Sequence, residues 1–371
     1  MEEKILVTGA NGFIGKNLIA ELKNRGYDTV FACDLDTTDE ERKAYAAQCT
    51  FVFHLAGVNR PKVESEFVTG NTDFTRTILT DLKEAGNPVP VLLSSSTQAE
   101  LDNPYGESKR EAERLVFSYG EQTGAKVFVY RLPGVFGKWC RPNYNSVVAT
   151  FCHNIARDLP ITISDPAKEV DLVYIDDVIE AFLGALAGEG SRAGDFYRVD
   201  PVHTITLSDL AETIRSFRES RKTLGLPNGS DPLERKLYST YLSYLPADDF
   251  AYPLQMKKDE RGSFTEFLKT ADRGQVSVNV AKPGITKGNH WHHTKNEKFL
   301  VVKGQARISF RRIGEEEVIS YDVSDRELTV VDIPTGYLHN ITNTGNEDLI
   351  TIMWANEPFN PEHPDTYHET V

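Results

Sequence analysis

The sequence predicts an α/β domain built on a parallel sheet, followed by an all-β domain. Two observations carry this prediction. In the first part of the chain, short apolar runs alternate with segments of helical spacing, as strand–helix–strand units do. From about residue 255, short β-rich runs are separated by Gly, Pro and Asn turns, which is typical of an antiparallel barrel or jelly roll. We therefore expect a first domain over residues 1–245 and a second over 255–371.

The apolar runs of the first domain are rich in Val, Leu and Phe and do not alternate with polar residues, so we expect strands buried on both faces. These runs lie at 4–10, 28–34, 50–57, 89–96 and 125–133, with helical segments such as 16–26 and 108–124 between them. In the second domain, the runs lie at 274–284, 297–312, 316–324, 326–334 and 349–357. Residues 224–254 contain prolines and tyrosines and predict an ordered, partly extended bridge.

Composition excludes several classes of function. At 371 residues, the chain is long enough for two cores. Its formal net charge of −14 argues against a nucleic-acid partner, which would need a basic face. No apolar run reaches the roughly 18 residues of a membrane span, and we expect no signal peptide because the N-terminus lacks a basic region followed by an apolar one. The cysteines lack metal-ligand or disulfide spacing, so we expect reduced thiols in the cytoplasm.

A glycine-rich loop joins the first expected strand to the first expected helix. Gly9, Gly12 and Gly15 let the backbone approach a pyrophosphate at the helix N-terminus, as in a Rossmann-type domain. Asp34 ends the second strand, 19 residues after Gly15. A carboxylate there can bind both ribose hydroxyls of NAD and would repel a 2′-phosphate. The alternatives are an ordinary glycine turn and a solvated loop acid, and the strand–loop–helix context favours the dinucleotide.

A tyrosine and a lysine stand one helical turn apart. Tyr105 and Lys109 share a helix face. An ammonium near a phenol favours the phenolate, so the pair could act as acid or base for hydride chemistry at a carbonyl. Ser96 ends the preceding strand and could polarise the carbonyl oxygen. Such tyrosine–lysine pairs are usually structural, but the glycine loop and the serine-ended strand favour catalysis.

Residues 1 to about 243 resemble the extended short-chain dehydrogenase/reductases of the nucleotide-sugar epimerase and reductase type. The matching pieces include "TGANGFIG", "HLAG", "YGESK", "YRLPGVFG" and Asn71 in "GNTDFTRTIL". The resemblance implies that Ser96, Tyr105 and Lys109 are catalytic. It also implies that the cofactor is bound by Gly9, Asn11, Gly12, Phe13, Ile14, Gly15, Asp34, Leu55, Ala56, Gly57 and Lys109.

The chain departs from this family at one place. Only nine positions lead from Ser96 to Tyr105, whereas the family interval is usually over twenty. The loop that would cover the substrate is therefore very short. We expect the pocket to be closed by residues 138–146, by the second domain, or by both.

The second domain carries a cluster of histidines. His290 and His292 are two apart and point to one face of a strand, whereas His293 points away and should be solvated. Glu297 returns on the next strand, and His339 follows a Pro-x-Gly turn. Three imidazoles and one carboxylate suit Zn, Mn, Fe or Ni. Any one of these histidines could be structural, but the complete pattern predicts a metal site.

Two motifs in this domain resemble the cupin signatures, and both are complete. "G(x5)HxH(x4)E(x6)G" fits Gly284–Gly304, and "PxGxxHxxxN" fits Pro334–Asn343. Residues 255–371 therefore resemble a cupin, which implies a jelly-roll barrel. They also resemble the sugar-nucleotide 3,5-epimerases, in which the histidine matching His290 is the base and no metal is needed. His290 is here in a metal-ligand position, and a metal-bound imidazole is a poor base. Another group would then move the proton, and the sequence leaves open Lys258, Glu266, Lys298 and Tyr337.

The whole chain resembles the bifunctional capsule and O-antigen enzymes of UDP-N-acetyl-L-fucosamine synthesis. The resemblance implies that the cupin epimerises carbon 3 of a UDP-2-acetamido-2,6-dideoxy-4-hexulose. The reductase then reduces the 4-keto group to give UDP-N-acetyl-6-deoxy-L-talosamine. It also implies zinc and NADPH, although Asp34 speaks for NADH. We expect a homodimer through the cupin.

Two rival functions remain at this point. The cupin could be a dimerisation or sugar-sensing module attached to a working reductase. It could also be a metal-dependent oxygenase, because cupins with this ligand set bind iron as well.

Overall fold

The computed structural model describes residues 3–371, which form two compact units. The first unit runs up to Arg215 and includes Ser230–Pro246, and the second comprises Ser216–Gly229 with Ala247–Val371. The expected α/β domain with a parallel sheet and the expected all-β domain are both confirmed. Residues 216–229, which lie inside the first expected range, group with the second unit.

The main sheet of the first unit has seven strands in the order β2-β1-β3-β4-β5-β9-β8. The strands are β1 (Lys4–Thr8), β2 (Thr29–Cys33), β3 (Phe51–His54), β4 (Val91–Ser96), β5 (Val127–Leu132), β8 (Arg192–Ala193) and β9 (Phe196–Tyr197). All neighbours are parallel except β8 and β9. The chain passes from β1 to β2 on one side and to β3 on the other. The carboxyl ends of β1 and β3 therefore flank a switch point, where open α/β sheets bind ligands.

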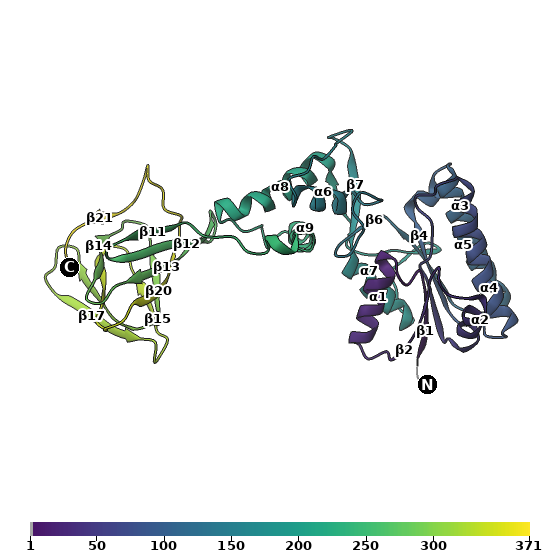
Figure 1. The fold of residues 1–371 in the computed structure, drawn as a ribbon, viewed down its shortest axis with the longest axis horizontal. Coiled ribbons are helices and arrows are strands. Elements are labelled where there is room, and N and C mark those ends of the chain that lie inside the picture. The colour runs from purple at the N-terminus through teal and green to yellow at the C-terminus, as the bar shows by residue number, and fades with distance from the viewer. Residues whose placement is uncertain (1–2) are drawn as a thin grey trace. The chain divides into compact units, whose positions relative to one another are not determined.

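Helices cover both faces of this sheet, with α1 and α7 on one side and α2, α4 and α5 on the other (Figure 1). The helices before residue 200 are α1 (Phe13–Asn24), α2 (Asp39–Gln48), α3 (Ser65–Phe67), α4 (Phe74–Glu84), α5 (Pro104–Thr123), α6 (Val147–Ile155) and α7 (Ile175–Leu186), with a π-helix at Val68–Asp73 and a 3-10 turn at Thr97–Glu100. Within residues 3–371, no helix is both long and apolar enough to cross a membrane.

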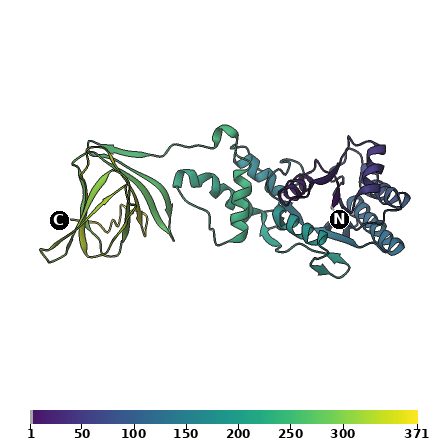
Figure 2. The ribbon, with the colours of Figure 1, turned by 90° about the horizontal axis from the view of Figure 1, so that it is seen from below.

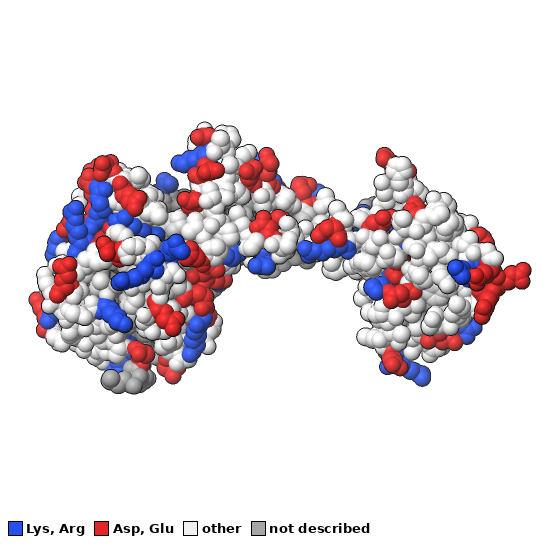
Figure 3. All heavy atoms as spheres, turned by 180° about the vertical axis from the view of Figure 1, so that it is seen from behind, with Lys and Arg blue, Asp and Glu red and all other residues white. Residues whose placement is uncertain are grey.

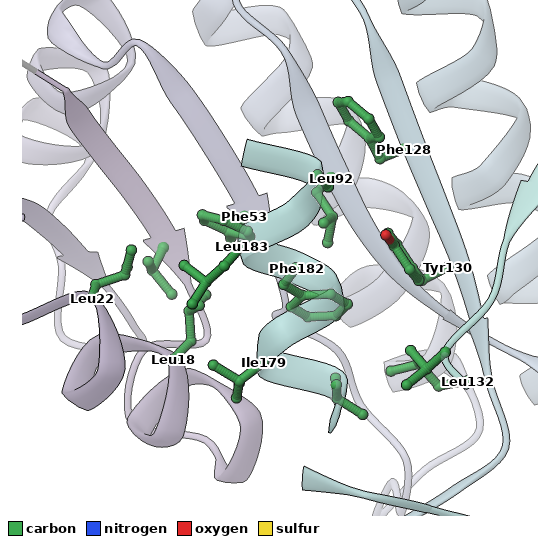
Figure 4. Packing of buried hydrophobic residues seen from close by; sticks show 14 of the residues in the cluster. Leu18, Leu22, Phe53, Leu92, Phe128, Tyr130, Leu132, Ile179, Phe182 and Leu183 are labelled. Atoms are coloured by element: carbon green, nitrogen blue, oxygen red, sulfur yellow. The ribbon is translucent and has the colours of Figure 1, made fainter. Parts of the chain in front are cut away.

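Alternate residues of each strand enter two different cores. Phe53 and Leu92 pack with α1 and α7 on one face (Figure 4), whereas their neighbours Val52 and Leu93 pack against α4 and α5 on the other. All four side chains are almost completely buried. Because both faces are apolar, the strands appear in the sequence as continuous hydrophobic runs.

The rest of the first unit is a small sheet with helices around it. Its strands are β10 (His203–Thr206), β7 (Glu169–Tyr174) and β6 (Gly134–Phe136), in that order. The helices are α8 (Leu207–Thr223), which continues into the second unit, and α9 (Pro232–Leu242).

The bridge over residues 224–254, which we expected to be partly extended, contains the helix α9. Asp231 caps it by accepting hydrogen bonds from the backbone N–H groups of Leu233 and Glu234.

The second unit consists of two facing antiparallel sheets (Figures 1 and 2). One has the order β11-β12-β13-β20-β15-β18 and the other β17-β16-β19-β14-β21. The strands are β11 (Met256–Asp259), β12 (Gly262–Thr270), β13 (Gly274–Ala281), β14 (Thr286–Trp291), β15 (Glu297–Lys303), β16 (Gln305–Arg312), β17 (Val318–Ser324), β18 (Val330–Ile333), β19 (Tyr337–Asn343), β20 (Leu349–Ala355) and β21 (Tyr367–His368), preceded by a 3-10 turn at Ala247–Asp249. Phe299, Ile308 and Ile341 are buried in the core between the sheets.

The surface is mixed in charge. On the face drawn in Figure 3, acidic and basic side chains are intermingled over both units. This pattern accords with the net charge of −14, in which 55 acidic residues outnumber 41 basic ones.

Candidate functional sites

The glycine loop closes tightly between β1 and α1. Gly9 has φ +66, and a Cβ there would lie 2.8 Å from the backbone nitrogen of Ala56. A Cβ on Gly15 would lie 2.3 Å from the carbonyl oxygen of Gly9. Helix α1 begins at Phe13, and its N-cap Gly12 supplies no side-chain cap. The first-turn N–H groups therefore face a loop that only glycine permits, which fits a bound pyrophosphate.

Asp34 lies beside this loop, where the sequence places it. Its carboxylate accepts hydrogen bonds from the backbone N–H groups of Asn11, at 2.7 Å, and Leu35, at 2.8 Å. The side chain therefore helps to shape the glycine loop, a structural role in addition to the expected one. Its negative charge still lies next to the loop, where it would repel the 2′-phosphate of NADPH.

The structure brings the three predicted catalytic residues to one end of the sheet. Ser96 ends β4, and Tyr105 and Lys109 lie on one face of α5. The Tyr105 hydroxyl donates to the side-chain oxygen of Asn59 at 3.0 Å, and Lys109 Nζ donates to the carbonyl oxygen of Ser94 at 3.2 Å. Lys109 Nζ lies 6.0 Å from the centre of the Tyr105 ring. A carbonyl oxygen between Ser96 and Tyr105 would have two hydroxyl donors.

Burial controls the protonation of this pair. It raises the pKa of Tyr105, and the Ser96 hydroxyl opposes that change only in part. It also lowers the pKa of Lys109 to about 8, against the influence of Glu113. We expected Lys109 to lower the pKa of Tyr105, but burial has the larger effect and the pKa rises. A tyrosine held in its protonated form is suited to donate a proton to a carbonyl that is being reduced.

A cavity of about 870 Å³ opens over these residues. Of the predicted catalytic and cofactor-binding residues, those lining it are Gly9, Asn11, Gly12, Phe13, Ile14, Gly15, Leu55, Gly57, Ser96, Tyr105 and Lys109. Ala56 packs behind Gly9, and Asp34 bonds the loop from outside. Residues 139–141 and 144–147 form another wall, so the segment expected to close the pocket does border it. The hydroxyl of Tyr244 holds this wall by donating to the carbonyl oxygen of Cys140 at 2.5 Å.

Two further polar residues are buried next to residues that line the cavity. His54 is buried between the hydroxyls of Thr8 and Thr75, each 2.8 Å from a ring nitrogen. Burial and the charge of Lys109 lower its pKa to about 3, so the ring is neutral. Asn71, on the π-helix, accepts from the backbone N–H of Val58 and donates to its carbonyl oxygen. These contacts give "HLAG" and Asn71 a structural task beside the site.

Four side chains of the second unit converge where β14, β15 and β19 meet. His290 is on β14, His292 follows that strand, Glu297 begins β15 and His339 is on β19. Each offers a ligand atom, and these atoms all lie within 4.8 Å of one another. Pairing of β14 with β19 sets His290 directly opposite His339. His293 is exposed, as expected, and is not part of the cluster.

The atoms at the centre of this cluster match the ligands of a shared ion. The Nε2 atoms of His292 and His339 lie 3.6 and 3.3 Å from Oε2 of Glu297. Within residues 3–371, none of these three buried atoms has a hydrogen-bond partner, which is unusual for buried polar atoms. The Nδ1 atom of His292 donates to the carbonyl oxygen of Asp365 at 2.5 Å, so the Nε2 lone pair faces the centre. Although burial opposes it, His292 and His339 hold the pKa of Glu297 below its usual range.

A second cavity, of about 590 Å³, lies beside the cluster. Of the four candidate proton-transfer groups, Lys258 and Glu266 line it. Lys298 and Tyr337 are not among its lining residues. The geometry therefore favours Lys258 and Glu266 over the other two.

Sequence reasoning missed two residues of this site. His368 lines the second cavity, and its ring centre lies 5.9 Å from that of His290. Asp365 contacts His292 and the residues that follow it. Both belong to a C-terminal segment with a strand of only two residues, β21, which carries no periodic pattern. The only signal in the sequence is that several acids and histidines lie near residue 365, and this signal does not single out either residue.

Comparisons with known proteins agree with this architecture. Residues 5–199 match the model of the NAD dependent epimerase/dehydratase family, and residues 257–367 match the polysaccharide biosynthesis C-terminal domain. The chain is 47% identical over 364 residues to a Pseudomonas aeruginosa protein named UDP-2-acetamido-2,6-beta-L-arabino-hexul-4-ose reductase, covering 98% of each chain.

Solved structures extend this likeness. A crystal structure of the Staphylococcus aureus capsular polysaccharide assembling protein CapF superposes with a TM-score of 0.94 at 49% identity, covering 99% of this chain and 100% of that one. A Thermotoga maritima UDP-glucose 4-epimerase, at 20% identity and a TM-score of 0.53 over 65% of this chain and 98% of its own, shares the fold. This chain belongs to the NAD dependent epimerase/dehydratase family, and its second unit is a polysaccharide biosynthesis C-terminal domain.

Proposed function

We propose that this protein is a bifunctional nucleotide-sugar enzyme of capsule synthesis. The second unit, a cupin, epimerises carbon 3 of a UDP-2-acetamido-2,6-dideoxy-4-hexulose. The first unit then reduces the 4-keto group to give UDP-N-acetyl-6-deoxy-L-talosamine. The name of the Pseudomonas relative supports a UDP-4-hexulose as substrate, and that of the Staphylococcus protein supports a role in capsular polysaccharide assembly.

The observation that carries this proposal is that each unit has its own cavity, lined by side chains of different chemistry. One cavity has a serine, a tyrosine and a lysine, which suit reduction of a carbonyl. The other borders a cluster of three histidines and a glutamate, which a reductase alone does not need. Both chemistries act at a keto sugar, because inversion requires a proton made acidic by a neighbouring carbonyl. Reduction removes that carbonyl, so epimerisation comes first.

In the first unit, the chain binds and protonates the substrate. The N–H groups at the start of α1 hold the pyrophosphate of a nicotinamide dinucleotide, whose contribution when bound is the hydride. Ser96 orients the 4-keto oxygen, and Tyr105 gives it a proton while Lys109 supports the tyrosine. The family resemblance favours NADPH. The charge of Asp34 keeps NADH as the alternative.

In the second unit, His290, His292, Glu297 and His339 are the proposed ligands of Zn²⁺. When bound, the metal would polarise the keto oxygen as a Lewis acid. The convergence of partnerless buried atoms supports such an ion. Lys258 and Glu266, which line the cavity, are the proposed groups that move the proton at carbon 3.

We further propose a cytoplasmic homodimer that pairs through the second unit. The cysteines in the described residues are free thiols, which suits a reducing compartment. Large apolar side chains are exposed on strands at the edges of both sheets: Val318, Ile319 and Tyr321 on β17, and Val330 on β18. A second copy covering them would remove this apolar area from water. The same exposed edges favour the main alternative, a working reductase whose second unit serves only for dimerisation or sugar sensing.

Deuterium exchange tests the proposal. The protein is incubated with the 4-keto UDP-sugar in heavy water without nicotinamide, and carbon 3 is followed by NMR. We expect the wild-type protein to incorporate deuterium at carbon 3. We expect no incorporation after chelation or in the His290→Asn variant. Absence of exchange in a metal-loaded protein that still reduces the sugar would refute the epimerase. If the dimer and turnover of the authentic substrate survive His290→Asn, the scaffold alternative holds. Iron content with oxygen uptake would point to an oxygenase instead.

A further inference from the structure

The C-terminal segment of the chain returns to the histidine cluster after β20 ends at Ala355. Its short strand β21 pairs antiparallel with β14, so that His368 lies opposite His290 and Tyr367 lies opposite Trp291. The Tyr367 ring also stacks on Trp291, with ring centres 4.9 Å apart. The segment is therefore fixed against the strand that carries a proposed metal ligand.

Asp365 is the residue of this segment that hydrogen-bonds to His292 and to the turn after it. Its carbonyl oxygen accepts from Nδ1 of His292 at 2.5 Å. Its carboxylate accepts from the backbone N–H groups of His293, Thr294 and Lys295 at 3.0, 2.9 and 2.9 Å, and from the Thr294 hydroxyl at 3.1 Å. One residue thus binds four consecutive residues through five hydrogen bonds. Its φ of +39, which is uncommon outside glycine, shows that the surrounding contacts determine this conformation.

The turn that Asp365 holds connects two of the proposed ligands. His292 stands at its start and Glu297 follows its end. The carbonyl contact fixes which nitrogen of His292 carries the proton and how the ring is turned, and the carboxylate fixes the path of the backbone toward Glu297. The same turn carries Lys295, a buried side chain that lines the second cavity and donates to the hydroxyl of Thr366 at 3.3 Å.

We infer that Asp365 is a positioning residue for the proposed metal centre, which it preorganises by fixing His292 and the turn that leads to Glu297. Partners of this kind set the tautomer and direction of a ligating imidazole, and their loss weakens metal binding even though they do not touch the ion. The inference rests on the metal centre under Proposed function, but not on which reaction the centre serves. A residue needed only to anchor the C-terminal segment would affect stability and leave the centre unchanged.

Metal affinity and coordination geometry test the inference in the full-length protein. Asp365→Ala and Asp365→Asn are loaded with Co²⁺, whose visible absorption reports on the ligand geometry, and Zn²⁺ affinity is measured by competition with a chelator. Asp365→Ala keeps the backbone carbonyl that accepts from His292 but removes the carboxylate that holds the turn. We expect it to lose roughly 10- to 100-fold in Zn²⁺ affinity and to change the Co²⁺ spectrum. Asp365→Asn keeps one acceptor oxygen for the turn, so its loss should be smaller. Asp322→Ala removes an exposed carboxylate paired with Arg307 and serves as the matched control, with no change expected.

The outcomes separate this inference from the proposed function. An unchanged affinity and Co²⁺ spectrum in Asp365→Ala, even with a lower unfolding temperature, would overturn it. If Asp365→Ala does not fold, an unchanged Zn²⁺ affinity and Co²⁺ spectrum in Asp365→Asn would overturn the inference in the same way. A wild-type protein that binds neither Zn²⁺ nor Co²⁺ at the cluster would overturn both the inference and the metal centre. A weakened and altered centre in the variants upholds the inference even where carbon 3 shows no exchange in the wild type.

Discussion

The two units gather their polar side chains in different ways. In the first, the glycine loop follows β1, "HLAG" follows β3 and Ser96 ends β4, so all three lie at the carboxyl edge of one parallel sheet. In the second, the cluster depends on the register of antiparallel strands, with His290 opposite His339 and His368 opposite His290. A parallel sheet assembles a site through its connection order, whereas an antiparallel barrel needs specific cross-strand pairs.

This contrast has an electrostatic side. The polar groups of the first site have hydrogen-bond partners within the chain, as Tyr105 has in Asn59 and Lys109 has in Ser94. The second site leaves the facing atoms of His292, Glu297 and His339 without such partners. The chain itself therefore holds the catalytic side chains proposed for the first site, whereas the proposed ion would supply the partners that the second site lacks.

The largest expected effect separates the two chemistries. Tyr105→Phe keeps the ring and its packing but removes the proton that the reduction requires, so the reduction rate should fall by roughly 10²- to 10⁴-fold. Deuterium exchange at carbon 3 should remain at the wild-type rate, because the second unit does not use this hydroxyl. Nicotinamide oxidation and NMR measure the two steps on the same preparation. A parallel fall in exchange would contradict the assignment of the two reactions to separate units.

Metal removal should affect only the second unit. Chelation leaves three buried polar atoms without a partner, and an ion present at about 1,000 times its Kd contributes roughly 4 kcal/mol to the free energy of unfolding. Calorimetry with and without chelator should show one transition moving to lower temperature. Leu92→Ala identifies the other transition, since it opens a cavity in the first core and should cost about 2–5 kcal/mol there. A chelator effect on the transition that Leu92→Ala shifts would contradict the comparison.

The difference between the sites also explains what the sequence could predict. Gly9, Ser96, Tyr105 and Lys109 were accessible because strand–helix alternation already places strand ends together. The proposed metal ligands could be predicted from their spacing in two short motifs, one around His290 and Glu297 and one around His339. Asp365 could not, because a two-residue strand has no periodicity and its pairing joins distant parts of the chain.

The sequence pattern also failed to predict two features of the first unit, the raised pKa of Tyr105 and the helix at Pro232–Leu242. Burial, which depends on the finished fold, decides that the pKa of Tyr105 rises. The helix at Pro232–Leu242 arises from a local cap at Asp231 within a segment whose prolines and tyrosines suggested extended chain.

A smaller effect concerns the choice of cofactor. Asp34→Asn removes the charge that would repel a 2′-phosphate but keeps an oxygen for the N–H of Asn11. A like-charge interaction near a protein surface is worth ~1–2 kcal/mol, so the ratio of kcat/KM for NADPH to that for NADH should rise about 10-fold. Asp36→Asn, two residues along the same loop, is the control. Equal changes with both cofactors would mean that Asp34 acts only by shaping the glycine loop.

The smallest expected effect is a pH dependence confined to the first unit. Burial lowers the pKa of Lys109 to about 8 and raises that of Tyr105, so Lys109 loses its proton first as the pH rises. If the ammonium supports the tyrosine, kcat/KM for reduction should fall through pH 8, by up to about 10-fold one unit above it.

The contribution of Lys109 to the stability of the first unit should move in the opposite direction. The folded pKa of Lys109 lies below the unfolded value of 10.5, so between these values the unfolded chain binds more protons. The contribution of Lys109 to the free energy of unfolding therefore rises with pH across that window. The buried cysteines, whose pKa values burial raises, oppose it above about pH 9, so the Lys109 contribution is the difference between wild type and Lys109→Met. Lys109→Met should abolish both trends and leave the pH profile of carbon-3 exchange unchanged. A wild-type reduction rate that stays flat to pH 9 would instead mean that Lys109 acts as a neutral hydrogen-bond donor, through its contact with Ser94, and that its charge has no part in the reaction.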